Sequence, residues 1–306
     1  MREVRVRGEG LRFPEGPVAL ADGSVLVCEV ERGTLARVTP AGERETVAEC
    51  GGGPNGAAAG PDGRIYVANN GGLEWDESAG FLAPVGCALP IAGRIEAVDL
   101  ATGAAETLYT ECDGRPLEAP NDIVFDAEGG FWFTDSGHWS GRVEQSGAIY
   151  YARPDGSSIV AAVESFPAPN GIGISPDGGR LYASSTGAGR LWFWEIEAPG
   201  VLRGGDTFFA PGNANFLWSP ASYALLDSLA IDAEGNVCQA NILSGVSVVS
   251  PTGELLEHLP IDDPFTTNIC FGGPDRRTAF ITGAGNGKLF EVGWPRPGGV
   301  LNFDLG

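Results

Sequence analysis

One short motif recurs six times along the chain in a constant register, and this repeat limits the possible folds more than any other feature. Each copy opens with a polar residue, continues as a short apolar run, and turns seven or eight residues later into a second apolar run. The copies open at Glu15, Asn55, Asn121, Asn170, Asp227 and Thr267, which we call the lead residues. Their turns carry pairs such as Asp22-Gly23 and Asp177-Gly178, residue types that close hairpins. Each copy therefore predicts two antiparallel strands.

The spacing of the lead residues predicts the architecture. They are 40, 66, 49, 57 and 40 residues apart, and each interval leaves room for two further strands, such as GTLARVTP with GERETVAE. Four strands repeated every 40 to 50 residues or so are typical of propeller blades. We therefore expect an all-β fold, a single six-bladed β-propeller over residues 1–306 with four antiparallel strands per blade. Two packed β-sandwiches are the alternative, but sandwich strands need not repeat one motif at one phase.

The two ends of the chain are expected to share the last blade. Only 39 residues follow Thr267, enough for about three strands, whereas Glu3 to Arg7 forms an unused strand near the N-terminus. We expect this first strand to pair with KLFEVGW, from Lys288 to Trp294. The pairing would close the ring and remove exposed sheet edges.

Charge and cysteine usage limit the function classes. Nineteen basic and forty acidic residues give a net charge of −21, which repels nucleic acid and anionic lipid surfaces. No apolar run reaches the roughly 18 residues of a membrane span, and the N-terminal residues do not form the apolar core of a signal peptide. Six scattered cysteines without a CxxC pair fit reduced thiols. We expect a cytoplasmic protein, monomeric or weakly homo-oligomeric, with a small-molecule partner and neither nucleic acid nor membrane.

The lead residues are expected to meet at one place. The first strand of each blade lines the central channel, so equivalent positions on the six strands form a ring. Two carboxylates and three carboxamides in that ring are hard oxygen ligands, suited to a divalent cation. With only His138 and His258 in the chain, a three-histidine zinc site is excluded. Any single lead residue could instead cap a turn, but two buried carboxylates together would require a cation.

Five motifs in this order resemble a known family. They are FPEGP at 13–17, APND at 119–122, PNGIGISPDG at 169–178, DSLAID at 227–232 and TNICFGG at 267–273. The chain resembles the senescence marker protein, gluconolactonase and luciferin-regenerating enzyme family of six-bladed propellers over nearly its full length, with diisopropyl fluorophosphatase as a more distant relative.

The resemblance implies a function and site residues. It implies that Glu15, Asn170 and Asp227 hold one divalent metal ion, with Asn121 as a further ligand or a substrate contact. Ca²⁺ is the first expectation, and Zn²⁺, Mn²⁺, Mg²⁺ and Fe²⁺ are alternatives. Family members hydrolyse lactones, notably sugar lactones such as gluconolactone. Several of them carry an arginine two residues before the third lead residue to grip substrate hydroxyls, where this chain has Ala119.

We therefore expect a metal-dependent lactonase, a carboxylic ester hydrolase. Asp227 and Asn121 are the catalytic candidates, and Asp227 would act as general base, as metal ligand, or as both. Asn121, Asn55, Trp75 and His138 are the substrate-binding candidates.

Some of these expectations have alternatives. The insertion at 69–90 carries Trp75 and Phe81, which would belong to a lid or would anchor the insertion to a neighbouring blade. His138 is alternatively a surface residue, which is the more usual place of a lone histidine in a loop. A non-catalytic propeller that binds a metal or a protein partner, and a phosphotriester hydrolase, are the alternative functions.

Overall fold

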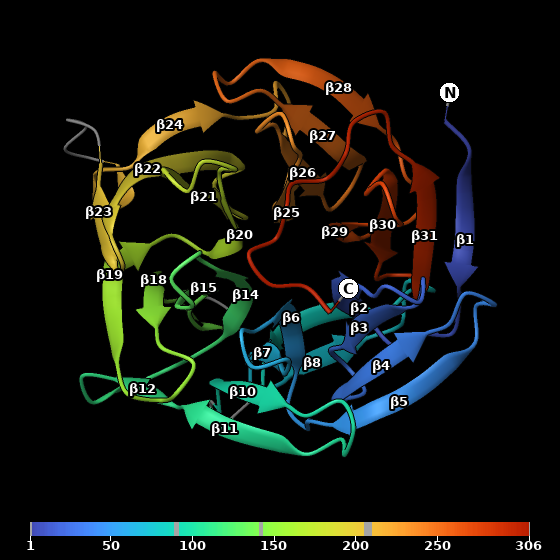
Figure 1. Ribbon diagram of the computed structural model, residues 1–306, viewed down its shortest axis with the longest axis horizontal. Helices are drawn as coiled ribbons and strands as arrows, with labels where there is room; N and C mark the ends of the chain where they lie inside the picture. The colour runs from blue at the N-terminus through green and yellow to red at the C-terminus, as the bar shows by residue number, and fades with distance from the viewer. Residues whose placement is uncertain (1, 89–91, 141–142, 205–209, 306) are drawn as a thin grey trace.

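Six antiparallel sheets follow one another around a central axis, as the repeat predicts (Figure 1). This arrangement is seen in a computed structural model that describes residues 2–88, 92–140, 143–204 and 210–305. In every blade but the last, the strands run outward from the axis in chain order. The strand that carries the lead residue is the innermost, so the six repeats become six equivalent walls of one channel.

Blades 1 to 3 have four strands each, in order from the axis outward. They are β2 (Pro14–Ala19), β3 (Val25–Glu29), β4 (Thr34–Val38) and β5 (Arg44–Glu49) in blade 1; β6 (Pro54–Ala59), β7 (Ile65–Asn69), β10 (Arg94–Val98) and β11 (Ala105–Tyr109) in blade 2; and β14 (Pro120–Phe125), β15 (Phe131–Asp135), β18 (Gly147–Ala152) and β19 (Ile159–Phe166) in blade 3.

Blades 4 to 6 repeat the same order. They are β20 (Pro169–Ile174), β21 (Arg180–Ser185), β22 (Arg190–Ala198) and β23 (Val201–Arg203) in blade 4; β25 (Leu226–Ile231), β26 (Val237–Asn241), β27 (Gly245–Val249) and β28 (Leu255–Leu259) in blade 5; and β29 (Thr266–Gly272), β30 (Thr278–Gly283), β31 (Lys288–Gly293) and β1 (Val4–Gly8) in blade 6. In blade 4 a further strand, β24 (Asn215–Trp218), pairs with the first half of β22.

Several short elements lie outside the six blades. Three hairpins leave the blades, namely β8 (Leu73–Asp76) with β9 (Ala83–Cys87), β12 (Glu111–Cys112) with β13 (Arg115–Pro116), and β16 (Trp139–Ser140) with β17 (Val143–Glu144). A 3-10 turn at Pro211–Asn213 is the only helical element in the described part of the chain. Within those residues, none of the helical structure has the length and apolar character that crossing a lipid bilayer would require.

The ring is closed by the strand from near the N-terminus, and this prediction is confirmed. Strand β1 pairs antiparallel with β31, with Val4 opposite Val292 and Val6 opposite Phe290. Blade 6 thus combines one strand from near the start of the chain with three from near its end (Figure 1). All six cysteines are free, as the sequence suggested, so the closure depends on strand pairing and packing without a disulfide.

Apolar contacts between adjacent blades form the core. One cluster combines Trp132 and Ile149 of blade 3 with Leu181 and Trp194 of blade 4, and all four side chains are fully buried. Large aromatic side chains fill the wedge-shaped space between twisted sheets. Every blade therefore supports its two neighbours.

The inner strands share one irregularity that shapes the channel. Each lead residue is the second residue of its strand, and in all six blades the pairing with the next strand shifts register at this point. Such β-bulges bend a strand and change the direction of its side chains. In three blades a glycine follows the lead residue. At Gly16, where φ is +49°, a Cβ atom would lie 2.2 Å from the carbonyl oxygen of Asn55 in the next blade.

This close approach gives a test of the ring. Gly16→Ala should destabilise the protein by more than about 2 kcal/mol, because it adds a steric clash to the cost of a left-handed residue. Gly63→Ala is the matched control, since Gly63 also has a positive φ, of +78°, but has open space around it. It should cost only about 1 kcal/mol. Urea denaturation curves of both variants provide the comparison, and equal losses would contradict the close packing at Gly16.

Candidate functional site

The lead residues come together because each inner strand contacts the inner strands of both neighbouring blades. Five of the six are buried, and Asn121 is half-buried. The carboxyl group of Glu15 lies close enough to that of Asp227 for the two charges to affect each other. The structure thus places the lead residues from distant parts of the sequence around one end of the channel.

Glu15 is held rigidly in this ring. Its side chain is 3 % exposed, and its Oε2 atom accepts hydrogen bonds from the backbone N–H of Gly16 and from Nδ2 of Asn268, each at 3.1 Å. Burial raises the pKa of Glu15 well above its ordinary value, and the negative charges of Asp227 and Asp122 raise it further. A carboxylate in such surroundings requires a positive charge nearby in order to remain ionised.

Asp227 and Asn170 form the opposite part of the ring. Burial raises the pKa of Asp227 to about 8, and the charge of Asp122 adds to this, whereas a hydrogen bond with Asn170 opposes it. The amide of Asn170 is oriented on both sides, because Nδ2 donates to Thr186 Oγ1 at 3.1 Å and Oδ1 accepts from Ser228 Oγ at 3.3 Å. The backbone carbonyl of Asp227 accepts from Ser184 and Gln239, both at 2.7 Å, which fixes the strand.

Two of the lead asparagines have side-chain oxygens that accept no hydrogen bond. The Oδ1 atoms of Asn55 and Asn121 are buried and make no hydrogen bond. A buried amide oxygen without a partner costs free energy, typically 1–3 kcal/mol or so. Unpaired oxygens in a functional site suggest a missing ligand. Both atoms are therefore available to a cation or to a substrate group that donates a hydrogen bond.

Asp122, the residue after a lead, is a site residue that the sequence reasoning missed. It is 7 % exposed, its Oδ1 accepts from the N–H of Ile123 at 2.9 Å, and its Oδ2 accepts from the N–H of Ile172 at 3.3 Å. Burial raises the pKa of Asp122 to about 7, although these hydrogen bonds and one from Ser228 oppose the rise. The available signal was in the repeat itself, because three copies have glycine after the lead residue and this copy has aspartate.

The residues present fit a divalent cation. The ring offers carboxylates from Glu15 and Asp227, an oriented amide at Asn170, and the unpaired amide oxygens, which form an oxygen-rich set of the kind that Ca²⁺ or Mg²⁺ prefers. In the described part of the chain, no three His, Cys, Asp or Glu side chains form a group that could hold a metal ion by themselves. A cation here would therefore need asparagine oxygens as ligands in addition to the carboxylates.

The insertion packs against the neighbouring blades. The ring of Trp75 lies 4.9 Å from that of Phe13, and the ring of Phe81 lies 5.5 Å from that of Phe265, measured between centroids. The N–H of Leu82 donates to the carbonyl oxygen of Gly285 in blade 6 at 3.1 Å. These contacts attach the hairpin of blade 2 to blades 1 and 6. Residues 89 and 90 of the predicted insertion lie outside the described residues.

His138 lies next to blade 3, just before strand β16. Its imidazole lies near the carboxyl group of Glu118, three residues before Asn121, and its Nδ1 atom is buried without a partner. Burial and the neighbouring Asp135 raise the pKa of Glu118. The carboxylate of Asp135 accepts hydrogen bonds from the backbone N–H groups of Glu118 and Ala119, each at 2.8 Å. These bonds fix the segment that leads to Asn121.

Known proteins share this architecture and sequence pattern. The family model described as the SMP-30/gluconolactonase/LRE-like region matches residues 13–285. The chain is 27 % identical over 260 residues to lactonase drp35 of Staphylococcus saprophyticus, a match that covers 83 % of this chain and 72 % of that protein. It is 24 % identical over 315 residues to the gluconolactonase of Zymomonas mobilis, with 92 % and 79 % covered.

A solved structure extends the likeness to the whole chain. The calcium-binding protein regucalcin of Agrobacterium tumefaciens superposes with a TM-score of 0.72 at 20 % sequence identity, and the match covers 98 % of each chain. At this identity the likeness shows a common fold.

The buried carboxylates predict an unusual dependence of stability on pH. Between about pH 4 and pH 8, metal-free folded protein holds protons that the unfolded chain has released, because the pKa of Asp227 is raised from 3.8 to about 8. Its stability should therefore fall across this range, by on the order of a few kcal/mol. Ca²⁺ should reduce the loss by neutralising the carboxylates. Urea denaturation at several pH values, in EDTA and in Ca²⁺, measures this, and a metal-free stability that rises with pH would contradict the buried cluster.

Proposed function

Because the chain belongs to the SMP-30/gluconolactonase/LRE-like family, we propose that it is a lactonase whose activity depends on one divalent cation in the central channel. The family match covers most of the chain, and two relatives are named as lactonases. The observation that supports the site most directly is the ring of buried oxygen atoms, in which Asn55 and Asn121 leave acceptors unpaired. The calcium-binding protein of the same fold makes Ca²⁺ the first metal to test.

The ring residues have separate roles in this proposal. Glu15, Asn170 and Asp227 would hold the cation, and Asn121 would complete its ligands or contact the substrate. A cation so placed would polarise the lactone carbonyl and stabilise the negative charge that develops on its oxygen. The amide of Asn55, which is also in the ring, would contact substituents of the lactone ring.

The attacking water needs a proton acceptor nearby. Asp227 is our candidate, because it is a carboxylate of the ring and would lie close to a water molecule held beside the cation. Its orientation is fixed through Asn170 and through the bonds to its own backbone carbonyl. Asp122, held by the N–H groups of Ile123 and Ile172, is the next carboxylate along the channel and adds negative charge there.

The substrate is expected to be a small lactone that fits the mouth between the insertion and blade 3. Gluconolactone is the sugar lactone named for a relative and is therefore the first substrate to assay. Ala119, two residues before Asn121, cannot make the contact with substrate hydroxyl groups that an arginine at this position would make. Trp75, which contacts Phe13, would contact the substrate from the side of the insertion, and His138 would contact it from the side of blade 3.

A lactone panel tests the activity and its metal dependence. The purified protein should release acid from one or more lactones, including gluconolactone, in a pH-stat assay. Turnover should disappear in EDTA and return with Ca²⁺ or another divalent ion. A fluorophosphate substrate in the same panel tests for phosphotriester hydrolysis. Metal binding without turnover of any substrate would favour a non-catalytic propeller instead.

Asp227→Asn tests the proton acceptor. It should lower kcat/KM by at least about a hundredfold, because an amide cannot accept the proton from water. Asp232→Asn is the matched control, since Asp232 is also fully buried and follows the same strand at its other end, where it pairs with Arg296. That variant should lose stability and keep its turnover below its melting temperature. Near wild-type turnover of Asp227→Asn with metal still bound would refute the role of Asp227 as base.

A further inference from the structure

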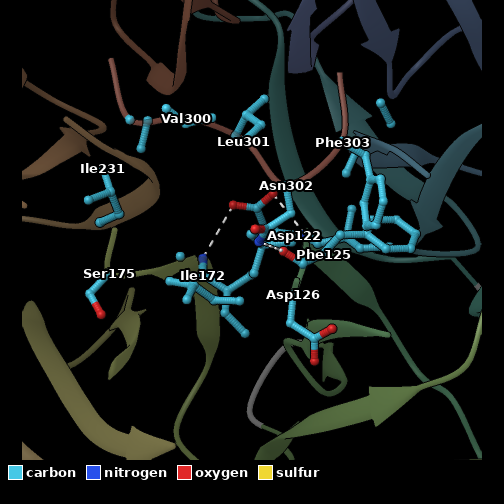
Figure 2. Close-up of a pocket in the computed structure, with 18 of the residues that line it drawn as sticks. Asp122, Phe125, Asp126, Ile172, Ser175, Ile231, Val300, Leu301, Asn302 and Phe303 are labelled. Carbon is cyan, nitrogen blue, oxygen red and sulfur yellow. Dashed lines mark hydrogen bonds between the residues drawn. The ribbon is translucent and has the colours of Figure 1, made fainter. Parts of the chain in front are cut away.

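A second compartment lies in the channel beyond the ring of lead residues. It is a pocket with a volume of about 490 Å³, lined by the later residues of the inner strands and by the segment Gly299–Phe303 near the C-terminus (Figure 2). The lead residues occupy the beginning of those strands, and none of them is part of the lining. Gly16, Asp122 and Asn268, which follow lead residues, line the pocket, so it adjoins the ring and extends away from it along the channel. Its volume is within the range of pockets that bind small molecules.

The walls of this pocket are mostly apolar. They include aliphatic side chains from several blades and aromatic ones from blade 3 and the C-terminal segment, among them Val18, Phe125, Ile172, Ile231, Leu301 and Phe303. Figure 2 shows several of these side chains arranged around one space. The binding of an apolar body to such a surface is favourable, because it removes apolar surface from water.

The charged groups of the pocket all have one sign. Five carboxylates line it, and no Lys, Arg or His side chain is among the described residues of the lining. The carboxylates are Asp122, Asp126, Glu128, Asp177 and Glu197. The net charge of −21 adds to the negative potential in the channel. An anionic ligand would be repelled from this pocket, whereas a cationic one would be attracted.

Asp122 gives the pocket a fixed anchor at its inner end. The side chain is 7 % exposed, and the N–H groups of Ile123 and Ile172 hold its two oxygens in place. Figure 2 shows it in the middle of the lining residues. A carboxylate that is already oriented loses little further freedom when it binds a positively charged group.

The segment Gly299–Phe303 near the C-terminus forms one wall of the pocket. It crosses the middle of the ring in Figure 1, and the N–H of Gly299 donates to the carbonyl oxygen of Ile231 at 2.9 Å. Further along, Nδ2 of Asn302 donates to the carbonyl oxygen of Phe125 at 2.8 Å, and the ring of Phe303 packs edge-on against Phe125 at 5.7 Å. These bonds attach the segment to blades 5 and 3. The pocket is therefore enclosed on this side by a segment that hydrogen bonds and ring packing attach to two blades.

We propose that this pocket binds an organic cation with an apolar body, such as a primary amine on an alkyl or aromatic chain. The apolar walls would bind the body, and the ammonium group would pair with Asp122 or with the carboxylates nearer the opening. The proposal does not depend on lactonase activity, because the apolar walls that would bind the body include none of the lead residues.

Three probes with one apolar body and different charges test the proposal. These are 4-phenylbutylamine, 4-phenylbutanol and 4-phenylbutanoate, titrated into Ca²⁺-saturated protein by calorimetry. The amine should bind at least about tenfold more tightly than the neutral alcohol, and the carboxylate should show no binding. Equal affinity for the amine and the alcohol, or no binding of the amine, would overturn the proposal.

Two further arms locate the bound amine. Ile231→Trp should fill the pocket and weaken amine binding at least about tenfold, whereas the matched control Leu255→Trp, on an exposed outer strand, should leave it unchanged. Ile174→Phe is the second filling variant if the first fails to fold. Repeating the titration in EDTA should give a similar affinity. If the amine bound only without Ca²⁺, its ammonium group would lie in the ring of lead residues, and the proposal would be overturned. Unchanged amine affinity in both filling variants would also overturn it.

Discussion

The mutual repulsion of buried carboxylates on the propeller axis is the constraint on which the site depends. Glu15, Asp122 and Asp227 come from three different blades and influence each other's protonation. Removing one such charge from water is costly, and placing three together is more so unless a positive charge is present. The six-bladed ring tolerates this arrangement because its stability comes from apolar contacts between neighbouring blades.

One local irregularity, repeated in all six blades, gives the channel its chemical variety. The bulge after each lead residue allows two successive residues of the inner strand to face the channel. In a regular strand only one of two successive residues would do so. Where the second residue is glycine, as at Gly16, the next blade approaches closely. Where it is aspartate or asparagine, as at Asp122 and Asn268, the ring gains another polar group. The same backbone thus supports different side-chain chemistry in each blade.

The sequence predicted those parts of the structure that follow from local, repeated signals. The hairpin turns and the phase of the lead residues indicated six blades, and the unused N-terminal strand indicated the pairing of β1 with β31. Asp122 was missed because its position in the channel depends on a bulge, and the change from glycine to aspartate after the lead residue was the one sign of it in the sequence. The packing of Trp75 on Phe13 involves an insertion in the repeat, and one wall of the pocket comes from the segment Gly299–Phe303 after the last repeat, so the positions of both segments follow from tertiary contacts.

The closure of blade 6 has a consequence for how the protein is made. The register that joins Val4 to Val292 connects parts of the polypeptide that leave the ribosome far apart in time. Blades 1 to 5 can assemble during translation, whereas β1 must wait until residues up to Gly293 have been synthesised before it can pair with β31. Until then β1 presents an unpaired edge, so the nascent chain passes through a stage in which chaperone binding or aggregation competes with completion of the ring.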